Sequence, residues 1–234
     1  MSHYTREDIL ELIEEEDVEF IRLQFTDTFG NLKNMAVTAK QIHVVLDEQC
    51  MFDGAAIHGF DTAHVDELVL VPDLDTFTIF PWRPQRGRVA RFICDVRYPD
   101  GTPFVADSRH ILKEVVREAE KDGYTFNVGP ESEFFLFDTA EDGSPTTTTS
   151  EKGDFFDIGP VDAGENARRD IVLSLSEMGF EMESSYHSNE AAQHQIDFKF
   201  SDGIHTADNI MTYKLAVRTV ARRHGLHATF MPKP

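Results

Sequence analysis

The most constraining stretch of the chain is residues 129–137, with the sequence GPESEFFLF. A Gly-Pro pair opens it and apolar residues close it, which predicts a strand entered through a turn. Successive strand side chains point to opposite faces, so Glu131 and Glu133 should share one face, with Cα atoms roughly 6.6 Å apart. Carboxylates are costly to bury without partners. This face is therefore either solvated or occupied by a cation.

Composition limits the classes of protein to which the chain can belong. Its 234 residues, 41% of them hydrophobic, suffice for two modest domains. A formal net charge of -20 argues against nucleic acid as a partner, because phosphate repels it. The dispersed acidic residues suit either a halophilic source or an ordinary acidic enzyme.

The sequence also predicts a cytoplasmic location without membrane association. It contains no apolar run of about 18 residues, the length expected of a membrane-spanning helix. Its acidic first residues do not resemble a signal peptide. The 2 cysteines lack a metal-type spacing and suit a reducing compartment.

Turn-forming residues and hydrophobic periodicity divide the chain into two parts. Residues 1–103 are strand-rich, and residues 104–234 alternate helix and strand, with the Pro-Asp-Gly-Thr-Pro segment at 99–103 as the predicted boundary. Thr5 and Asp8 predict a capped first helix, and Ser108 is the predicted cap of a later helix with an apolar face. The other expected elements are a hairpin over 18–37, a short helix over 39–49, strands at 67–71, 76–80 and 89–96, helices at 164–178 and 207–223, a strand pair within 181–200, and a strand at 227–231.

Several segments, taken in order, resemble type I glutamine synthetases, the ATP-dependent glutamate–ammonia ligases. They are FIRLQFTD at 20–27, MFDG at 51–54, PD at 72–73, FPW at 80–82, ARFICD at 90–95, GPESEFFLF at 129–137 and HGLHATFMPKP at 224–234. The resemblance implies an α+β fold, with an N-terminal β-grasp domain over 1–103. It also implies part of an α+β catalytic domain with a curved antiparallel sheet over 104–234.

The resemblance implies a reaction in two steps. Glutamate attacks the γ-phosphate of ATP to give γ-glutamyl phosphate, and ammonia then displaces phosphate. Mg²⁺ or Mn²⁺ would neutralise the phosphate charge, and hard oxygen ligands suit either ion. The implied assembly is a homo-oligomeric ring, or an association with a full-length paralogue.

Matching the family position by position suggests roles for individual residues. Glu131 and Glu133 match metal-binding glutamates, and Asp53 matches the aspartate that helps to bind ammonium in a neighbouring subunit's active site. The matches at the nucleotide site are Glu183, Phe198, Lys199 and Phe200. From the residues alone, a solvated strand face, an Asp-Gly turn and ordinary strand positions explain the same residues.

The chain departs from the family pattern at two metal-ligand positions. Residues 187–197 read HSNEAAQHQID, where the family has HEVAPGQHEID, so Ser188 and Gln195 replace two glutamates. Amide and hydroxyl groups bind Mg²⁺ more weakly than carboxylates do. A two-residue slip would substitute Glu190 and Asp197 on the same face, but the matching residues around them oppose it.

Further departures leave two functional hypotheses open. Ala55 and Ala56 replace two serines, His58 replaces a glutamate, and the sequence ends at Pro234, before further family segments. We therefore expect an incomplete N-terminal half of a ligase, inactive by itself. The alternatives are a non-catalytic paralogue with a regulatory or structural role, and a relative that ligates glutamate to another amine. The histidines, among them His187 and His194, are expected to be structural.

Overall fold

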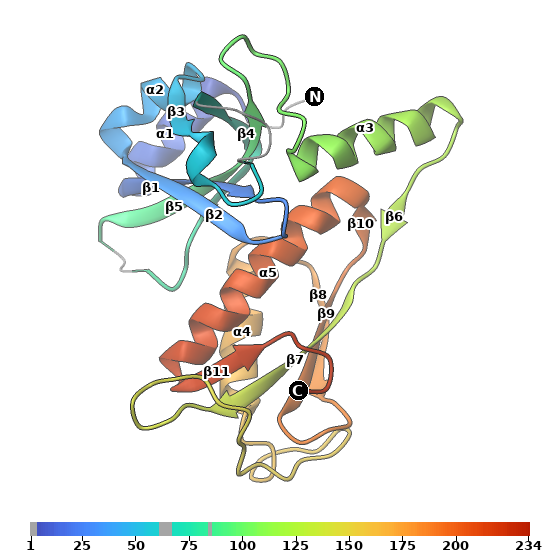
Figure 1. The fold of residues 1–234 in the computed structure, drawn as a ribbon. Coiled ribbons are helices and arrows are strands. Elements are labelled where there is room, and N and C mark those ends of the chain that lie inside the picture. Colours follow the sequence, from blue (N-terminus) through green and yellow to red (C-terminus); the bar gives the residue numbers. More distant parts are fainter. Residues whose placement is uncertain (1–3, 61–66, 84–85) are drawn as a thin grey trace. The chain divides into compact units, whose positions relative to one another are not determined.

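The computed structural model describes residues 4–60, 67–83 and 86–234, which fall into two compact units, Met1–Phe126 and Asn127–Pro234. Figure 1 shows the elements of both units. None of the helices within the described ranges is long and apolar enough to cross a membrane. The domain boundary expected at residues 99–103 stays a prediction.

The first unit is built on a 5-stranded sheet with the order β2-β1-β5-β4-β3. Its central strands β1 and β5 are parallel, and the other neighbours are antiparallel. The predicted hairpin is present as β1 and β2. β4 is continuous where two runs were expected, because the chain stays extended through an irregular register between Asp73 and Thr78. The strands are β1 (Val18–Thr26), β2 (Leu32–Thr38), β3 (Cys50–Asp53), β4 (Glu67–Ile79) and β5 (Arg88–Arg97).

Short helices complete this unit and bury apolar side chains against the sheet. α1 (Arg6–Glu15) begins at the predicted cap, where Thr5 and Asp8 form a reciprocal capping box. The expected helix over 39–49 is shorter, with a 3-10 turn at Ala39–Gln41 followed by α2 (Ile42–Leu46). Fully buried residues from α1, α2 and three strands form one core: Ile9, Val45, Ile21, Leu23, Leu68, Leu70 and Phe92.

α3 (Ser108–Lys121) is capped by Asp107, not by the predicted Ser108. Asp107 Oδ1 accepts a hydrogen bond from the backbone N–H of Arg109 at 3.0 Å. Its Oδ2 accepts one from Val96 N–H of β5 at 2.9 Å, so the cap also ties the helix to the sheet. The predicted apolar face remains uncovered in this chain: no residue of α3 is buried, and Val115 is 60% exposed.

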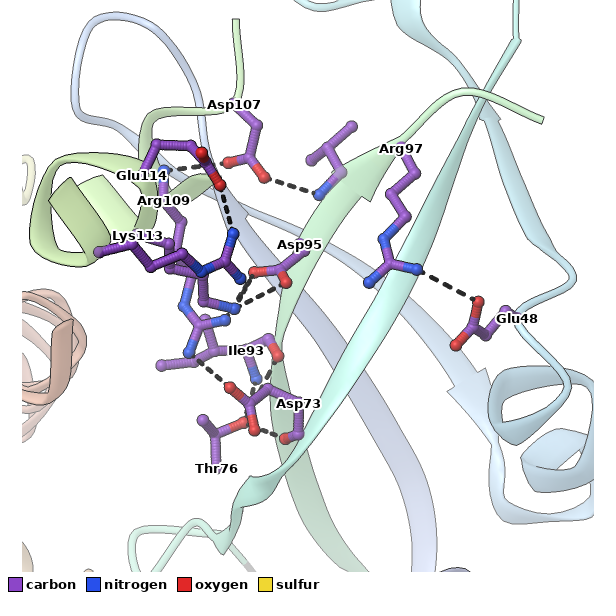
Figure 2. A network of polar contacts seen from close by, with 12 residues as sticks. Glu48, Asp73, Thr76, Ile93, Asp95, Arg97, Asp107, Arg109, Lys113 and Glu114 are labelled. Atoms are coloured by element: carbon purple, nitrogen blue, oxygen red, sulfur yellow. Dashed lines mark hydrogen bonds and ion pairs between the residues drawn. The ribbon is translucent and has the colours of Figure 1, made fainter. Parts of the chain in front are cut away.

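A charged network joins α3 to the neighbouring strands, as Figure 2 shows. Arg109 reaches Asp73 of β4 at 2.7 Å and Asp95 of β5 at 2.6 Å. Lys113, one turn further along the helix, donates to both oxygens of Asp95 at 2.8 and 2.7 Å. Burial alone would raise the pKa of Asp95, but the Lys113 hydrogen bond and the charges of Arg109 and Lys113 outweigh it and lower that pKa.

The second unit has a 4-stranded antiparallel sheet with the order β11-β7-β9-β8, and α4 and α5 pack beside it (Figure 1). α5 begins four residues before the predicted start, because Asp202 caps it by accepting from Ile204 N–H and His205 N–H. The elements are β6 (Asn127–Val128), β7 (Glu131–Asp138), α4 (Glu165–Glu177), β8 (Met182–His187), β9 (Gln193–Phe198), β10 (Ser201–Asp202), α5 (Gly203–Arg223) and β11 (Leu226–Thr229).

The two faces of this sheet have different compositions. On the helix side, Phe134 of β7 lies near His194 of β9 and Tyr213 of α5, all fully buried. Alternation along β7 turns Glu131 and Glu133 to the opposite face, as the sequence predicted. The helices thus cover one apolar face. The opposite face is acidic at the start of β7 and carries the buried Phe135 and Phe137 further along the strand.

We expect Asp95→Asn to destabilise the first unit by about 2 kcal/mol, because Arg109 and Lys113 would lose a partly buried partner. The lowered pKa means that the folded state holds its proton less tightly than the unfolded chain. This contribution is present above the ordinary aspartate pKa of about 3.9 and is lost as the pH falls through the folded value. The measurement is urea unfolding at several pH values.

Glu118→Gln is the matched control, since it removes the partner of Lys121 from an exposed pair on the same helix. It should change the free energy of unfolding by less than about 0.5 kcal/mol. Equal effects of the two substitutions would contradict the role given to Asp95.

Candidate functional site

The register between β7 and β9 brings acidic side chains together on the uncovered face of the second sheet. Glu131 lies opposite Asp197, and Glu133 lies opposite Gln195. Directly opposed residues of antiparallel strands point to the same face. Asp197 therefore joins this face with no slip of register, and the described β7–β9 pairing shows no shift.

Ser188 and Gln195, the residues expected to replace two metal ligands, donate hydrogen bonds to carboxylates of this face. Ser188 is buried, and its Oγ donates to Glu133 Oε1 at 2.5 Å. Gln195 Nε2 donates to Asp197 Oδ1 at 2.9 Å. Neutral donors thus occupy acceptor positions on two of the acidic groups, which leaves those oxygens less available to a cation.

The alternative with Glu190 as a ligand has no support in the geometry. Glu190 lies in the turn between β8 and β9, where its backbone N–H donates to Gln193 Oε1 at 3.1 Å. It is not paired with β7 in the sheet. Of the two residues considered for a slipped site, Asp197 alone reaches the acidic face, and it does so in the unshifted register.

The negative charges of this face affect the pKa of Tyr186 on β8. It lies opposite Gln195, on the far side of β9 from β7. Partial burial and the charges of Asp197, Glu131 and Glu133 together raise the pKa of Tyr186. The same field favours a cation over the acidic face.

A cavity of about 190 Å³ adjoins Glu131 at the start of β7. Its lining includes three of the residues predicted for the nucleotide: Glu183, Phe198 and Phe200. Glu183 is exposed at the register shift between Met182 and Ser184. Such a bulge redirects a side chain out of the regular ladder. Asp197, Ser184, Gly129 and Pro130 complete the lining, which links the cavity to the acidic face.

The three consecutive residues 198–200 have different surroundings. The Phe198 ring is buried against Phe180 and Tyr213, with ring centroids at 5.2 and 5.8 Å. Phe200 is 58% exposed and is the aromatic side chain available at the cavity. Lys199 forms an exposed ion pair with Glu181 at 2.6 Å and is not part of the cavity lining. Its hydrogen bond to Glu181 raises the pKa of Lys199.

Asp53, the residue expected at the ammonium site, belongs to the first unit. It ends β3 and caps a 3-10 helix, Gly54–Ala56, by accepting from Ala55 N–H at 2.9 Å. Its side chain is exposed at this turn. The local structure is therefore the Asp-Gly turn that the sequence allowed, and its catalytic role stays a prediction.

Behind the acidic face, Glu151 forms a buried centre of hydrogen bonds that the sequence did not reveal. Its Oε1 accepts from Ala192 N–H at 2.5 Å and lies 2.7 Å from His187 Nε2. Its Oε2 accepts from the N–H groups of Ala163 and Gly164 at 2.7 and 3.1 Å. One carboxylate thus joins the β8–β9 turn to the start of α4.

His187 and His194 are fully buried, and the hairpin places them opposite each other, with ring centroids 5.1 Å apart. His187 Nδ1 also contacts Ser188 O at 2.7 Å. The pKa of His194 is lowered to about 2. Burial is the largest cause, followed by electrostatic repulsion from Arg168 and then from His187. His194 is therefore neutral, and Arg168 donates to its Nδ1 at 2.8 Å.

Glu151, Asp162 and His194 form a group whose ligand atoms lie within 4.8 Å of one another. Arg168 already contacts two of these side chains, at 2.7 Å from Asp162 Oδ2 and 2.8 Å from His194 Nδ1. Both oxygens of Glu151 already accept backbone N–H groups. We interpret the group as a buried ion-pair network that supports the wall of the site.

We expect Glu151→Gln to destabilise the second unit by about 3 kcal/mol, because an amide NH₂ would face backbone N–H donors inside the protein. The measurements are urea unfolding and amide hydrogen exchange, and the Ala192 and Gly164 amides should lose protection first. Glu177→Gln, at the exposed end of α4, is the control. It should change neither the free energy of unfolding nor the protection of these two amides. Retained protection at both amides would contradict this role of Glu151.

Comparison with known proteins relates this geometry to one family. The family described as "Glutamine synthetase, beta-Grasp domain" matches residues 17–99, and "Glutamine synthetase, catalytic domain" matches residues 105–234. The expected β-grasp and α+β catalytic folds are thereby confirmed. Glutamine synthetase of Clostridium saccharobutylicum is 58% identical over 234 residues, which make up 100% of this chain and 53% of that protein. Glutamine synthetase of Staphylococcus aureus strain Mu50 is 53% identical over 232 residues, which make up 99% of this chain and 52% of that protein.

Solved structures agree with this assignment. GmaS in complex with ADP superposes with a TM-score of 0.84 at 27% identity, covering 97% of this chain and 52% of that one. Plasmodium falciparum glutamine synthetase superposes with a TM-score of 0.86 at 21% identity, covering 100% of this chain and 51% of that one. At this identity the likeness supports the fold alone. The chain spans about half the length of the curated relatives it matches. With both family domains matched across it, the chain belongs to the glutamine synthetase family.

Proposed function

We propose that this chain is the N-terminal part of an ATP-dependent glutamate–ammonia ligase that acts through γ-glutamyl phosphate. The observation that carries the proposal is the position of Glu131, which belongs both to the acidic face and to the cavity with Glu183 and Phe200. A cation on the face and a nucleotide in the cavity would then share one boundary. The ADP bound to the related GmaS supports a nucleotide in this fold.

The donor set of the acidic face fits one hard divalent cation better than two. Carboxylate oxygens of Glu131 and Glu133, on one strand face, suit Mg²⁺ or Mn²⁺. Ser188 engages one oxygen of Glu133, and Gln195 and Ser184 engage both oxygens of Asp197. When bound, such an ion neutralises phosphate charge during phosphoryl transfer. The residues of this chain would hold and orient the nucleotide, with Phe200 stacking on the base and Glu183 contacting it at the cavity edge.

The remaining roles of the ligase extend beyond this site. Asp53 would attract ammonium for the second step, as a carboxylate attracts any cation. As the family resemblance implies, this site would be shared between copies of the chain in a homo-oligomeric ring. The setting would be cytoplasmic, which suits the free thiols of Cys50 and Cys94. The net charge of -20 would suit a halophilic source.

A second function, that of a non-catalytic paralogue associating with a full-length ligase, is favoured by the two neutral replacements. The hydrogen bonds from Ser188 and Gln195 satisfy the acidic side chains within the protein. A face satisfied in this way has less need of a cation. The experiment below separates the two functions by measuring metal affinity.

We expect weak binding of Mn²⁺ by the wild-type chain in calorimetric titration with a non-hydrolysable ATP analogue. Ser188→Glu combined with Gln195→Glu should raise the affinity at least about tenfold, because two carboxylates would replace neutral ligands. The control, Gln49→Glu with Ser176→Glu, adds the same charge at exposed positions and should have no such effect. Tight binding of two ions by the wild type would argue for an intact ligase site.

The nucleotide site is tested with two neighbouring residues. Phe200→Leu should weaken the binding of a fluorescent ATP analogue about tenfold, because stacking on the base is lost. Lys199→Met should leave that affinity unchanged, since Lys199 pairs with Glu181 away from the cavity. The reverse order of effects would overturn the proposed orientation of the nucleotide.

A further inference from the structure

A second cavity, of about 240 Å³, lies in the first unit between β5 and α3. Basic groups dominate its polar lining: Arg97 of β5 and His110, Lys113 and Arg117 of α3. The three helical residues are spaced three and four apart, so they share one side of α3. The chain as a whole has a net charge of -20, so this lining differs in sign from the average of the protein.

The acidic residue in this lining does not cancel the positive charge. Asp95 is already bound by Arg109 at 2.6 Å and by Lys113 at 2.7 Å. Arg109 is not among the lining residues, so one of the two cations that neutralise Asp95 acts from outside the cavity. The lining itself therefore carries more positive than negative side chains, and the glutamates that pair with Arg97 and Arg117 lie outside it.

Polar contacts beside the cavity join α3 to the sheet, and Figure 2 shows this network. Asp107 fixes the start of α3 to Val96 of β5, and Arg109 links the helix to both β4 and β5. The two walls are therefore joined before any ligand arrives. Preorganised groups lose less conformational freedom on binding, which favours affinity.

Arg97 and Arg117, the two arginines of the cavity lining, each pair with a glutamate that a more highly charged acceptor can displace. Arg97 lies 3.7 Å from Glu48, which is 53% exposed. Arg117 pairs with Glu114 on its own helix, and Glu114 is 49% exposed. Exposed pairs of this kind contribute little to stability, so exchanging them for a multiply charged ligand costs little.

We propose that this cavity is a binding site for a phosphate group, either as free phosphate or as part of a small phosphate monoester. Guanidinium groups present planar pairs of N–H donors that match phosphate oxygens, and the lysine ammonium adds a compact charge. The cavity has room for a phosphate with a small substituent. The site shares no residue with the proposed nucleotide and metal sites, so its test does not depend on the outcome of theirs.

The test is calorimetric titration of the purified protein with inorganic phosphate and, separately, with glycerol 3-phosphate, against sodium chloride at equal ionic strength. We expect saturable binding of at least one phosphate compound and none of chloride. Tighter binding of phosphate identifies the free ion, and tighter binding of the monoester identifies a substituted ligand. Absence of saturable binding of both at millimolar concentration overturns the proposal.

Variants locate the site. Arg97→Gln and Arg117→Gln should each weaken binding about tenfold, the loss expected for a hydrogen bond to a charged group. Arg169→Gln is the matched control, because it removes an exposed side chain of the same charge from α4. This variant should bind phosphate as the wild type does. Far-UV circular dichroism checks the fold of each variant. Equal weakening by all three substitutions would indicate nonspecific charge attraction and would also overturn the site.

Discussion

The antiparallel register between β7 and β9 is the constraint on which the second unit depends. It opposes Glu131 to Asp197 and Phe134 to His194, so one register places these carboxylates on one face and Phe134 and His194 on the face toward the helices. A slip by one residue would bury carboxylates against α4 and α5. The cost of burying those charges makes the register, and with it the composition of the site, close to fixed.

Buried charges behind the sheet reinforce this register at its turn. Glu151 accepts from Ala192 in the β8–β9 turn and from the first residues leading into α4. Arg168 compensates Asp162 in the same region. Since Glu151 has partners from distant parts of the chain, loosening one element exposes unpaired charge in another. The wall that carries Ser188 is thus held in place by groups that do not themselves reach the acidic face.

The sequence predicted those features that depend on local spacing. Alternation put Glu131 and Glu133 on one face, and the Thr5–Asp8 pair predicted the first helix cap. Where two residues satisfy the same local rule, the sequence does not decide between them: Asp107 and Ser108 can both cap, and only the contact with Val96 selects Asp107. Phe198 and Phe200 have the same alternation, yet contact with Tyr213 buries one of them. Glu151 had no local signal, because its partners lie 12 to 41 positions away.

The hydrogen bond from Ser188 to Glu133 bears on how this unit folds before any ligand is present. A strand face crowded with carboxylates repels itself until a cation arrives, so its folding is coupled to metal supply. Here a hydroxyl and an amide lie among the acids and donate to them. The sheet can therefore form in a metal-poor environment. We expect the second unit to fold without metal for this reason.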